Sequence, residues 1–554
     1  MTTRFATPTG DPNEEVCAAP GANGPFVRPA RGPNWAAALS TGVQGLAQPR
    51  ALAAGSRASS WSPEWATKPP GVTSPPQVRS KSGSNDAGPS ATAGTGSAHA
   101  APLLGLLRGR GHPGAPGNQT RKRVAVVGSG IAGLSAAWAL SDRAHVTLFE
   151  AADYLGGHTH TVDVTLKGPQ AADGPITHGV DTGFLVFNEH TYPLLIQLFA
   201  QLGVPVAKSD MSFSAQIRNA AGGDGIEWSG NNLNTVFAQR RNLLRPRFWG
   251  MLSDLLRFNR LCTDLAASGS EAQLAQPIGE FLAQHHFGQP FRDWYLLPMV
   301  ACIWSCPTTQ MLKFPIRTLI RFCHNHGLLQ VNDRPQWWTV QGGARHYVEA
   351  MRVAIHEVRL GTPVQAVYRP TASQDVVLQS AHGREHFDAV VMAGHSDQTL
   401  ALLAEPTDAE HRLLGAVRYH ANRAVLHTDI RMLPKRRAAW AAWNYERGGA
   451  GVDANAVCLH YLLNQLQPLP WKQPVVVSLN PLREPDPASV LGSYDYAHPV
   501  FDEAAVRAQG QLPNIQGSRG VWFAGAWTRY GFHEDGLLSG LTAAQGVIDR
   551  VLSA

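Results

Sequence analysis

Several features are missing from this chain of 554 residues, and each absence narrows what the protein can be. No run of about 18 uncharged apolar residues occurs, and no apolar signal region follows the first residue, so neither a membrane-spanning helix nor a secretory leader is expected. Six cysteines are too few for a disulfide framework in so long a chain. Cys302 and Cys306 have no second pair to complete a metal site. We therefore predict reduced thiols, no bound metal and a cytoplasmic protein.

Residues 1–120 lack sustained apolar periodicity and are rich in Ala, Gly, Pro and Ser. Such a segment cannot bury enough apolar area to offset its loss of conformational entropy, so we predict a disordered tail over 1–120. An organelle transit peptide, or a start codon placed too far upstream, would give a similar composition. Residues 1–123 hold 13 of the 47 basic residues and 5 of the 41 acidic residues. The excess positive charge thus belongs to the tail, and the rest of the chain is not expected to bind nucleic acid.

The most informative segment, residues 123–157, contains two short apolar runs separated by a glycine-rich turn and a stretch of small residues. Val124 to Val127 and Val146 to Phe149 predict buried strands, and Leu134 to Leu140 predicts a helix between them. This order of elements is that of the βαβ unit that binds a dinucleotide.

The glycines of this unit have separate physical tasks. Gly128 permits a tight turn, Gly130 lets the backbone approach a pyrophosphate, and Gly133 allows helix and strand to pack closely. The N–H groups and the positive dipole at the helix start would bind the phosphates. Glu150 ends the second strand, and its carboxylate can accept both hydroxyls of an adenosine ribose. The predicted dinucleotide site comprises Gly128, Gly130, Ile131, Ala132, Gly133 and Glu150.

Farther along the chain, residues 190–203 and 233–265 predict helices, and residues 361–367 and 387–393 predict strands. Residues 247–260 place aromatic and aliphatic side chains along one helix face, with arginines around it. A helix of this kind can lie on a membrane surface, or it can pack its apolar face in the core and leave its charges in water. The sequence leaves both interpretations open.

Three separated segments together resemble the flavin-containing amine oxidase superfamily, and the resemblance covers residues 121–554. The segments are Val124 to Gly157, which ends in Gly156-Gly157; the Gly342-Gly343 turn with the strand at Val364; and Val521 to Gly525 with Glu534 to Gly540. The resemblance implies an α/β fold with a Rossmann-like FAD-binding domain and an interleaved α+β substrate domain. It places FAD-binding parts at about 121–190, 340–400 and 515–554, and substrate-domain parts at about 191–339 and 401–514.

The same resemblance implies a site for non-covalent FAD that both ends of the chain complete. Beside the glycines of the first segment, the residues implied in FAD binding are Gly156, Gly157, His158, Val364, Gly525, Glu534, Asp535 and Gly536. The helix start at Glu534 to Gly536 would stabilise negative charge on the reduced flavin through its dipole. Ser493 stands where covalent members carry a cysteine, and His158 stands where an arginine is usual.

The side chains expected beside the flavin differ from those of true amine oxidases. Those enzymes commonly place a lysine near the flavin and flank its ring with two aromatic residues. Here no lysine occurs between Lys313 and Lys435, and the two aromatic positions fall on Tyr494 and His533. Asn188 could also face the ring, or it could cap the helix that follows. His533, Tyr494 and Asn188 are therefore the predicted catalytic residues.

Within the superfamily the chain is similar to a bacterial subgroup of predicted NAD/FAD-binding proteins associated with fatty-acyl modification. The similarity lies in Gly157 to Thr161, Val180 to Pro193, Asn325 to Leu329 and His395 to Gln398. It implies an FAD-dependent oxidoreductase that transfers a hydride from a hydrophobic substrate, such as a lipid acyl chain, to flavin N5. Two alternatives are an amine oxidase acting on a small or polyamine substrate and a non-catalytic flavin protein acting in a complex. The expected partners are a small-molecule or lipid substrate and a peripheral membrane contact, and the oligomeric state is left open.

Overall fold

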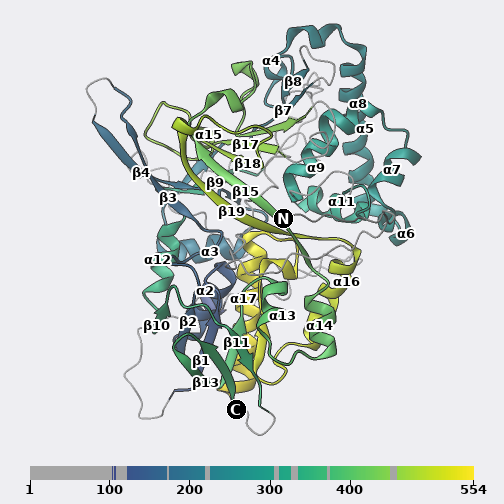
Figure 1. The fold of residues 1–554 in the computed structure, drawn as a ribbon. Helices are drawn as coiled ribbons and strands as arrows, with labels where there is room; N and C mark the ends of the chain where they lie inside the picture. The colour runs from purple at the N-terminus through teal and green to yellow at the C-terminus, as the bar shows by residue number, and fades with distance from the viewer. Residues whose placement is uncertain are drawn as a thin grey trace, which may run out of the picture.

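The computed structural model describes residues 103, 105–107, 121–170, 174–218, 225–304, 311–325, 335–370, 375–448 and 458–553 (Figure 1). Most of the predicted tail therefore lies outside the described residues, as do Cys306 and most of the Asn325 to Leu329 segment. The described end of the tail does not fit the prediction of disorder over 1–120. Leu103 and Leu107 are helical and buried in the main hydrophobic cluster, because their spacing puts both leucines on one face of a helical turn.

A parallel sheet of five strands lies at the lower end of the molecule in Figure 1. Its strands follow the order β10-β2-β1-β14-β20, with bounds Glu357–Arg359, His145–Phe149, Arg123–Val127, Ala389–Met392 and Val521–Phe523. The last four residues of β1 and of β2 are buried, as expected of strands covered on both faces. Strands from both ends of the chain thus share one sheet, and their carboxyl ends meet at one edge.

The first helix after β1 is packed against the last helix of the chain. All ten residues of α2 (Ile131–Leu140) are buried, and α17 (His533–Val547) lies alongside it (Figure 1). The two backbones approach most closely at Gly540, where an added Cβ would overlap the carbonyl oxygen of Ala132. A glycine here is therefore required by packing and not by helix propensity.

A second sheet of seven strands runs through the upper half of the molecule (Figure 1). Its order is β19-β15-β18-β17-β16-β7-β8, with bounds Val490–Val500, Arg418–His427, Val476–Leu479, Cys458–Leu462, Trp443–Arg447, Phe213–Ile217 and Ile226–Ser229. The register of β16 on β17 puts Trp443 opposite Tyr461 and Glu446 opposite Cys458. Because side chains alternate along a strand, one face of this sheet is aromatic and the other carries buried polar groups.

Smaller elements connect and cover the two sheets. The remaining strands are β3 (Thr161–Lys167), β4 (Pro175–Asp181), β5 (Phe187–Asn188), β6 (Val206–Ser209), β9 (Trp337–Val340), β11 (Ala366–Tyr368), β12 (Val376–Ser380) and β13 (Gly383–Phe387). The remaining helices include α3 (Pro193–Leu202), α4 (Leu233–Val236), α5 (Pro246–Ser268), α6 (Glu271–Ala275), α7 (Ile278–Gln284), α8 (Gln289–Phe291), α9 (Leu297–Trp304), α11 (Ile316–Asn325), α12 (Arg345–Arg352), α13 (Ser396–Leu402), α14 (Asp408–Leu414), α15 (Leu463–Leu466) and α16 (Glu503–Gln511). No helix in the described part of the chain is long and apolar enough to cross a bilayer.

Two predicted elements are wrong in extent. The helix predicted over 233–265 is instead α4, a 3-10 segment η2 (Arg240–Leu244) and α5. Pro246 begins α5 and forces Arg245 into an extended conformation, which interrupts the helix. The strand predicted over 361–367 contributes only the start of β11, because Gly361 adopts a left-handed φ of 56° in a turn. The strand predicted over 387–393 is confirmed as β14, although it is shorter.

The helix α5 packs its apolar face in the core, which is one of the two arrangements that the sequence left open. Phe248, Met251, Leu252, Leu255 and Phe258 are buried along that face. Two exposed apolar side chains, Trp249 and Leu256, are left outside it.

The approach of α17 to α2 predicts opposite effects for the same substitution at two helical glycines. We expect Gly540→Ala to lower the free energy of unfolding by about 1–3 kcal/mol, since the new methyl group must push the helices apart. Gly250→Ala in α5 is the matched control. The added methyl group would meet no atom within 4 Å, so this substitution should raise the free energy of unfolding by up to about 1 kcal/mol. Urea unfolding of both variants measures the difference, and equal effects would contradict the packing argument.

Candidate cofactor and substrate site

The turn after β1 forms a narrow cradle of backbone at the start of α2. Gly128 has a φ of 100°, which L side chains rarely adopt, and Gly130 precedes the helix without any side-chain cap. Gly156 pairs with Gly130 in an isolated bridge, and a Cβ at Gly157 would lie 3.1 Å from the Gly130 Cα. A helix start without a side-chain cap, with Gly156 and Gly157 next to it, has the room and the donors that a pyrophosphate requires. The residues present therefore fit a dinucleotide.

Glu150, which directly follows β2, stabilises this turn by accepting hydrogen bonds. One carboxylate oxygen accepts hydrogen bonds from the Ser129 N–H at 2.9 Å and from the Ser129 hydroxyl at 2.6 Å, and the other accepts from the Ala152 N–H at 2.8 Å. Glu150 also lines a cavity with Gly128, His158 and Gly394. Ribose binding by Glu150 stays a prediction. Ser129 is a contributor that the sequence motif does not specify, because that position tolerates any residue.

The other end of the chain returns to the same edge of the sheet. Gly525 follows β20, and its N–H donates to the Ser539 hydroxyl of α17 at 2.8 Å. The indole N–H of Trp527 donates to the Gly394 carbonyl beyond β14 at 3.2 Å. Val364 is buried two residues after Thr362, whose N–H donates to the Glu150 carbonyl at 2.8 Å. Gly525 and the segment that carries Val364 thus lie next to Gly394 and Glu150, which line the cradle cavity, and their role in FAD binding stays a prediction.

The acidic start of α17 is tied into the protein by its side chains. The Glu534 carboxylate accepts hydrogen bonds from the N–H groups of Leu194 and Leu195 at 2.8 and 3.0 Å, and so caps α3. Burial raises the pKa of Glu534 to about 8 and that of Asp535 to about 6. Asp535 accepts from the Phe532 N–H at 3.0 Å. The Gly536 N–H donates to the Phe532 carbonyl at 3.0 Å, and the predicted role of this turn toward flavin stays a prediction.

His158 and His160, which follow Gly157, both contact Tyr496, and His160 also meets two other tyrosines. The His158 ring stacks at 6.1 Å from Tyr496. The His160 ring stacks on Tyr154 at 4.5 Å and meets the edge of Tyr494 at 4.8 Å. Burial lowers the pKa of His160, which favours its neutral form. Tyr494 therefore belongs to a histidine–tyrosine group beside the glycine cradle.

His533 lies in a different group. Its ring is buried and stacks on Phe184 at 3.9 Å. Its Nε2 atom lies 2.6 Å from the Tyr347 hydroxyl, which in turn bonds the Thr159 hydroxyl. No hydrogen bond or ring contact joins His533 to Tyr494 among the described residues, and the catalytic role of both stays a prediction. Neither Thr159 nor Tyr347 was among the predicted site residues, although Thr159 lies in the Gly157 to Thr161 segment.

Asn188 has a structural explanation in the turn before α3. Its side-chain oxygen accepts hydrogen bonds from the N–H groups of His190 and Thr191 at 2.9 and 3.0 Å. Its amide nitrogen donates to the Thr191 hydroxyl at 2.9 Å. The capping alternative therefore accounts for all of these contacts, and the catalytic role of Asn188 stays a prediction.

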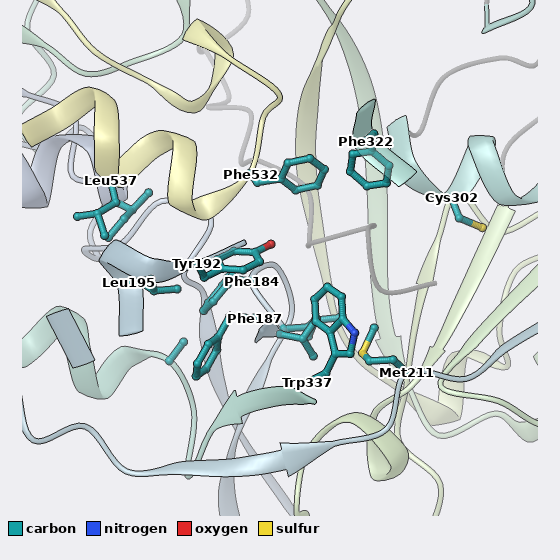
Figure 2. Packing of buried hydrophobic residues seen from close by; sticks show 14 of the residues in the cluster. Phe184, Phe187, Tyr192, Leu195, Met211, Cys302, Phe322, Trp337, Phe532 and Leu537 are labelled. Atoms are coloured by element: carbon teal, nitrogen blue, oxygen red, sulfur yellow. The ribbon is translucent and has the colours of Figure 1, made fainter. Parts of the chain in front are cut away.

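An aromatic cluster surrounds the start of α17 (Figure 2). We use this name for Phe184, Phe187, Tyr192, Phe322, Trp337 and Phe532. Phe322 and Phe532 stack at 5.3 Å, and Tyr192 meets Trp337 edge to face at 6.5 Å. The Tyr192 hydroxyl and the Trp337 indole nitrogen are buried without a hydrogen-bond partner among the described residues. Unpaired buried polar groups are costly, so these two atoms are candidates for ligand contacts.

A hollow next to the aromatic cluster is lined by arginines. Arg317, Arg321, Arg507 and Arg529 line it together with Tyr530, and no acidic residue is among the described lining. Arg507 pairs with Glu503 at 3.2 Å, and Arg529 lies 3.8 Å from Asp535. The hollow and the cluster share two elements: α11 carries both Arg321 and Phe322, and one loop carries both Tyr530 and Phe532. A buried aromatic cluster therefore lies near a hollow lined by arginines.

A buried polar network on the other face of the seven-stranded sheet was not expected. The nitrogen Nε2 of His460 lies 2.8 Å from the Glu446 carboxylate and 3.4 Å from the Cys458 sulfur. Burial lowers the pKa of His460, but Cys458 and Glu446 outweigh it and raise this pKa to about 9. Arg218 pairs with Glu446. These groups satisfy one another as an ionic network, and we assign no metal to them.

Comparison with known proteins was made on sequence and on fold. The model of the family described as flavin containing amine oxidoreductase matches residues 131–425. No curated protein matches the sequence at a significant level. The fold is similar to that of the CLA-producing fatty acid isomerase from P. acnes, at 14% identity and a TM-score of 0.51, over 78% of this chain and 100% of that chain.

Two amine-oxidising enzymes also share the fold. Cyclohexylamine oxidase from Brevibacterium oxydans IH-35A is 17% identical with a TM-score of 0.52, over 78% of this chain and 99% of that chain. Putrescine oxidase bound to putrescine is 14% identical with a TM-score of 0.52, over 77% of this chain and 99% of that chain. These likenesses confirm the predicted fold class. Since the family match spans more than half of the chain, the protein belongs to the flavin-containing amine oxidoreductases and is an FAD-dependent oxidoreductase.

Proposed function

We propose that this oxidoreductase acts on a hydrophobic substrate with an anionic head, of which a lipid acyl chain is the model. The observation that carries the proposal is the aromatic cluster beside the arginine-lined hollow. The cluster would exclude water from an acyl chain, and the arginines would attract a carboxylate or a phosphate. The same arginines would repel a protonated amine.

Two further observations support an acyl substrate. No lysine occurs between Lys313 and Lys435, the interval in which amine-oxidising members commonly carry one. One protein of similar fold is a fatty acid isomerase, although identity of 14% makes this a likeness of fold alone. Amine oxidation, the alternative, is left as an outcome of the substrate test below.

The chain's own residues divide into those that hold the cofactor and those that orient the substrate. The glycine cradle with the start of α2 would hold the pyrophosphate, and the first turn of α17 would face the flavin with backbone N–H groups. When bound, FAD accepts a hydride equivalent from the substrate. The His533–Tyr347–Thr159 group would hold a proton at His533 Nε2, and the Tyr192 hydroxyl would orient a polar group of the substrate.

Anaerobic bleaching of the oxidised flavin band tests the proposed substrate class. Flavin-loaded protein is mixed with a long-chain unsaturated fatty acid, with an acyl phospholipid, or with putrescine and cyclohexylamine. We expect bleaching with the acyl compounds and none with the amines. Bleaching by an amine would instead establish amine oxidation. Bleaching by chemical reduction but by no substrate would favour a non-catalytic flavin protein.

Gly130→Val tests the assignment of the cradle. The valine side chain would occupy the space above the start of α2, so we expect the variant to purify nearly free of flavin while its circular dichroism spectrum is unchanged. The ratio of flavin to protein absorbance measures this. A Gly130→Val protein that retains its flavin would show that FAD binds elsewhere.

Tyr192→Phe tests the substrate contact. Because the hydroxyl has no partner among the described residues, its removal should leave the unfolding temperature unchanged. Loss of one substrate hydrogen bond should raise the substrate concentration for half-maximal bleaching rate by about 2- to 10-fold. Tyr368→Phe, whose hydroxyl bonds Gln379 at 3.1 Å in another sheet, is the control and should not change this concentration. Equal behaviour of the two variants would remove Tyr192 from the site.

A further inference from the structure

Exposed apolar side chains gather where α4, η2 and the start of α5 meet. The exposed fractions are 55% for Leu233, 45% for Leu243, 87% for Leu244 and 50% for Trp249. We call these four residues the apolar tip. They are separate from the buried face of α5, which is already packed in the core. Contiguous exposed apolar side chains of this size mark interaction surfaces.

The members of the apolar tip are held together by contacts. The Trp249 indole N–H donates to the Leu243 carbonyl at 3.0 Å, and the Trp249 ring lies 5.3 Å from that of Phe237. The Phe237 N–H in turn bonds the Leu233 carbonyl at 3.1 Å. The tip is therefore one ordered surface. Its helix α4 lies at the opposite end of the molecule from β1 and β2 (Figure 1).

Positive charge surrounds the apolar tip. Arg240, Arg241, Arg245 and Arg247 alternate with its residues along the chain, and no acidic residue occurs between Glu227 and Asp254. Arg240, Arg241 and Arg247 are exposed. This arrangement of leucines and a tryptophan between arginines is the one that inserts shallowly into a bilayer interface while cations contact lipid phosphates.

A basic cleft adjoins the apolar tip on the polar side of the seven-stranded sheet. Its described lining includes Arg218, Arg431, Lys435, Arg436, Arg437 and Arg483, together with the acidic residue Glu227. Glu227 is paired with Arg436 at 2.8 Å, and Arg431 is paired with Asp429 at 2.7 Å. Arg241 reaches the cleft by donating to the Gly225 carbonyl at 3.4 Å. The positive potential of the tip thus continues into a hollow that can take an anionic headgroup.

We infer that the apolar tip docks on an anionic lipid surface, with its leucines and Trp249 in the interfacial layer and lipid phosphates against its arginines and the basic cleft. A protein partner is less consistent with the observations. No acidic residue lies between Glu227 and Asp254 to bind a basic partner protein. The exposed apolar side chains and the arginines around them instead match a phospholipid bilayer, whose interior is apolar and whose headgroups are anionic. The inference stands whatever substrate the enzyme oxidises.

Sedimentation of the full chain with vesicles tests the inference. We expect binding to vesicles of phosphatidylcholine with phosphatidylglycerol, weak binding to phosphatidylcholine alone, and weakening as salt is raised. Arg241→Gln with Arg247→Gln should weaken binding by about 10- to 30-fold. Leu243→Ser with Leu244→Ser should weaken it at least about tenfold at every salt concentration, because the apolar contribution is not screened.

Matched controls separate the tip from the rest of the molecule. Val353→Ser removes an equally exposed apolar side chain, 86% exposed after α12, and should leave vesicle binding unchanged. All variants keep the basic N-terminal residues and should keep the flavin content and unfolding temperature of the parent. Binding that survives the two leucine substitutions, or that is equal for neutral and anionic vesicles, would overturn the inference. These outcomes do not depend on flavin bleaching, so they can fail separately from the proposed function.

Discussion

The contact between α2 and α17 is the constraint on which the site depends. Gly540 lets the two helices meet at the Ala132 carbonyl, and this contact fixes the start of the last helix relative to the first dinucleotide turn. The start of α17 then sets the positions of the side chains next to the proposed flavin site. Glu534 caps α3, His533 stacks on Phe184, and Gly525 bonds back to Ser539. A split site of this kind is assembled by packing between remote segments, because neither end of the chain contains it alone.

Apolar side chains and arginines occur together at two places in the molecule. The aromatic cluster and the arginine-lined hollow occur together near the start of α17, and the apolar tip and the basic cleft occur together at the far end of the seven-stranded sheet. Both places combine apolar side chains with guanidinium groups. Arginine suits this pairing, since its planar charge binds carboxylate or phosphate in a fork while its stem packs on apolar neighbours. An enzyme that handles amphiphilic molecules would require both surfaces.

The local sequence was sufficient to predict the dinucleotide cradle, because this part of the site is formed by backbone. Gly128, Gly130, Gly133 and Glu150 follow from spacing within one βαβ unit, and each element lies where it was predicted. Prediction was wrong where a single residue interrupts a pattern. Pro246 divides the helix predicted over 233–265, and Gly361 shortens the strand predicted over 361–367. Hydrophobic periodicity averages over many residues, so it does not register one residue that changes the backbone direction.

The sequence by itself predicted a dinucleotide-binding βαβ unit, because a phosphate-binding turn and its strands are encoded by short-range spacing of glycine and apolar residues. FAD and the fold class followed from the resemblance of three separated segments to a known family. The sequence also showed the missing lysine between Lys313 and Lys435. Only the tertiary structure decided which side chains meet. It joined His533 to Tyr347 and Thr159, assigned Asn188 to a turn, left the Tyr192 hydroxyl unpaired among the described residues, and exposed Leu244 beside Trp249. The contacts of His533 join chain segments more than a hundred residues apart, and their formation is governed by packing that no local pattern records.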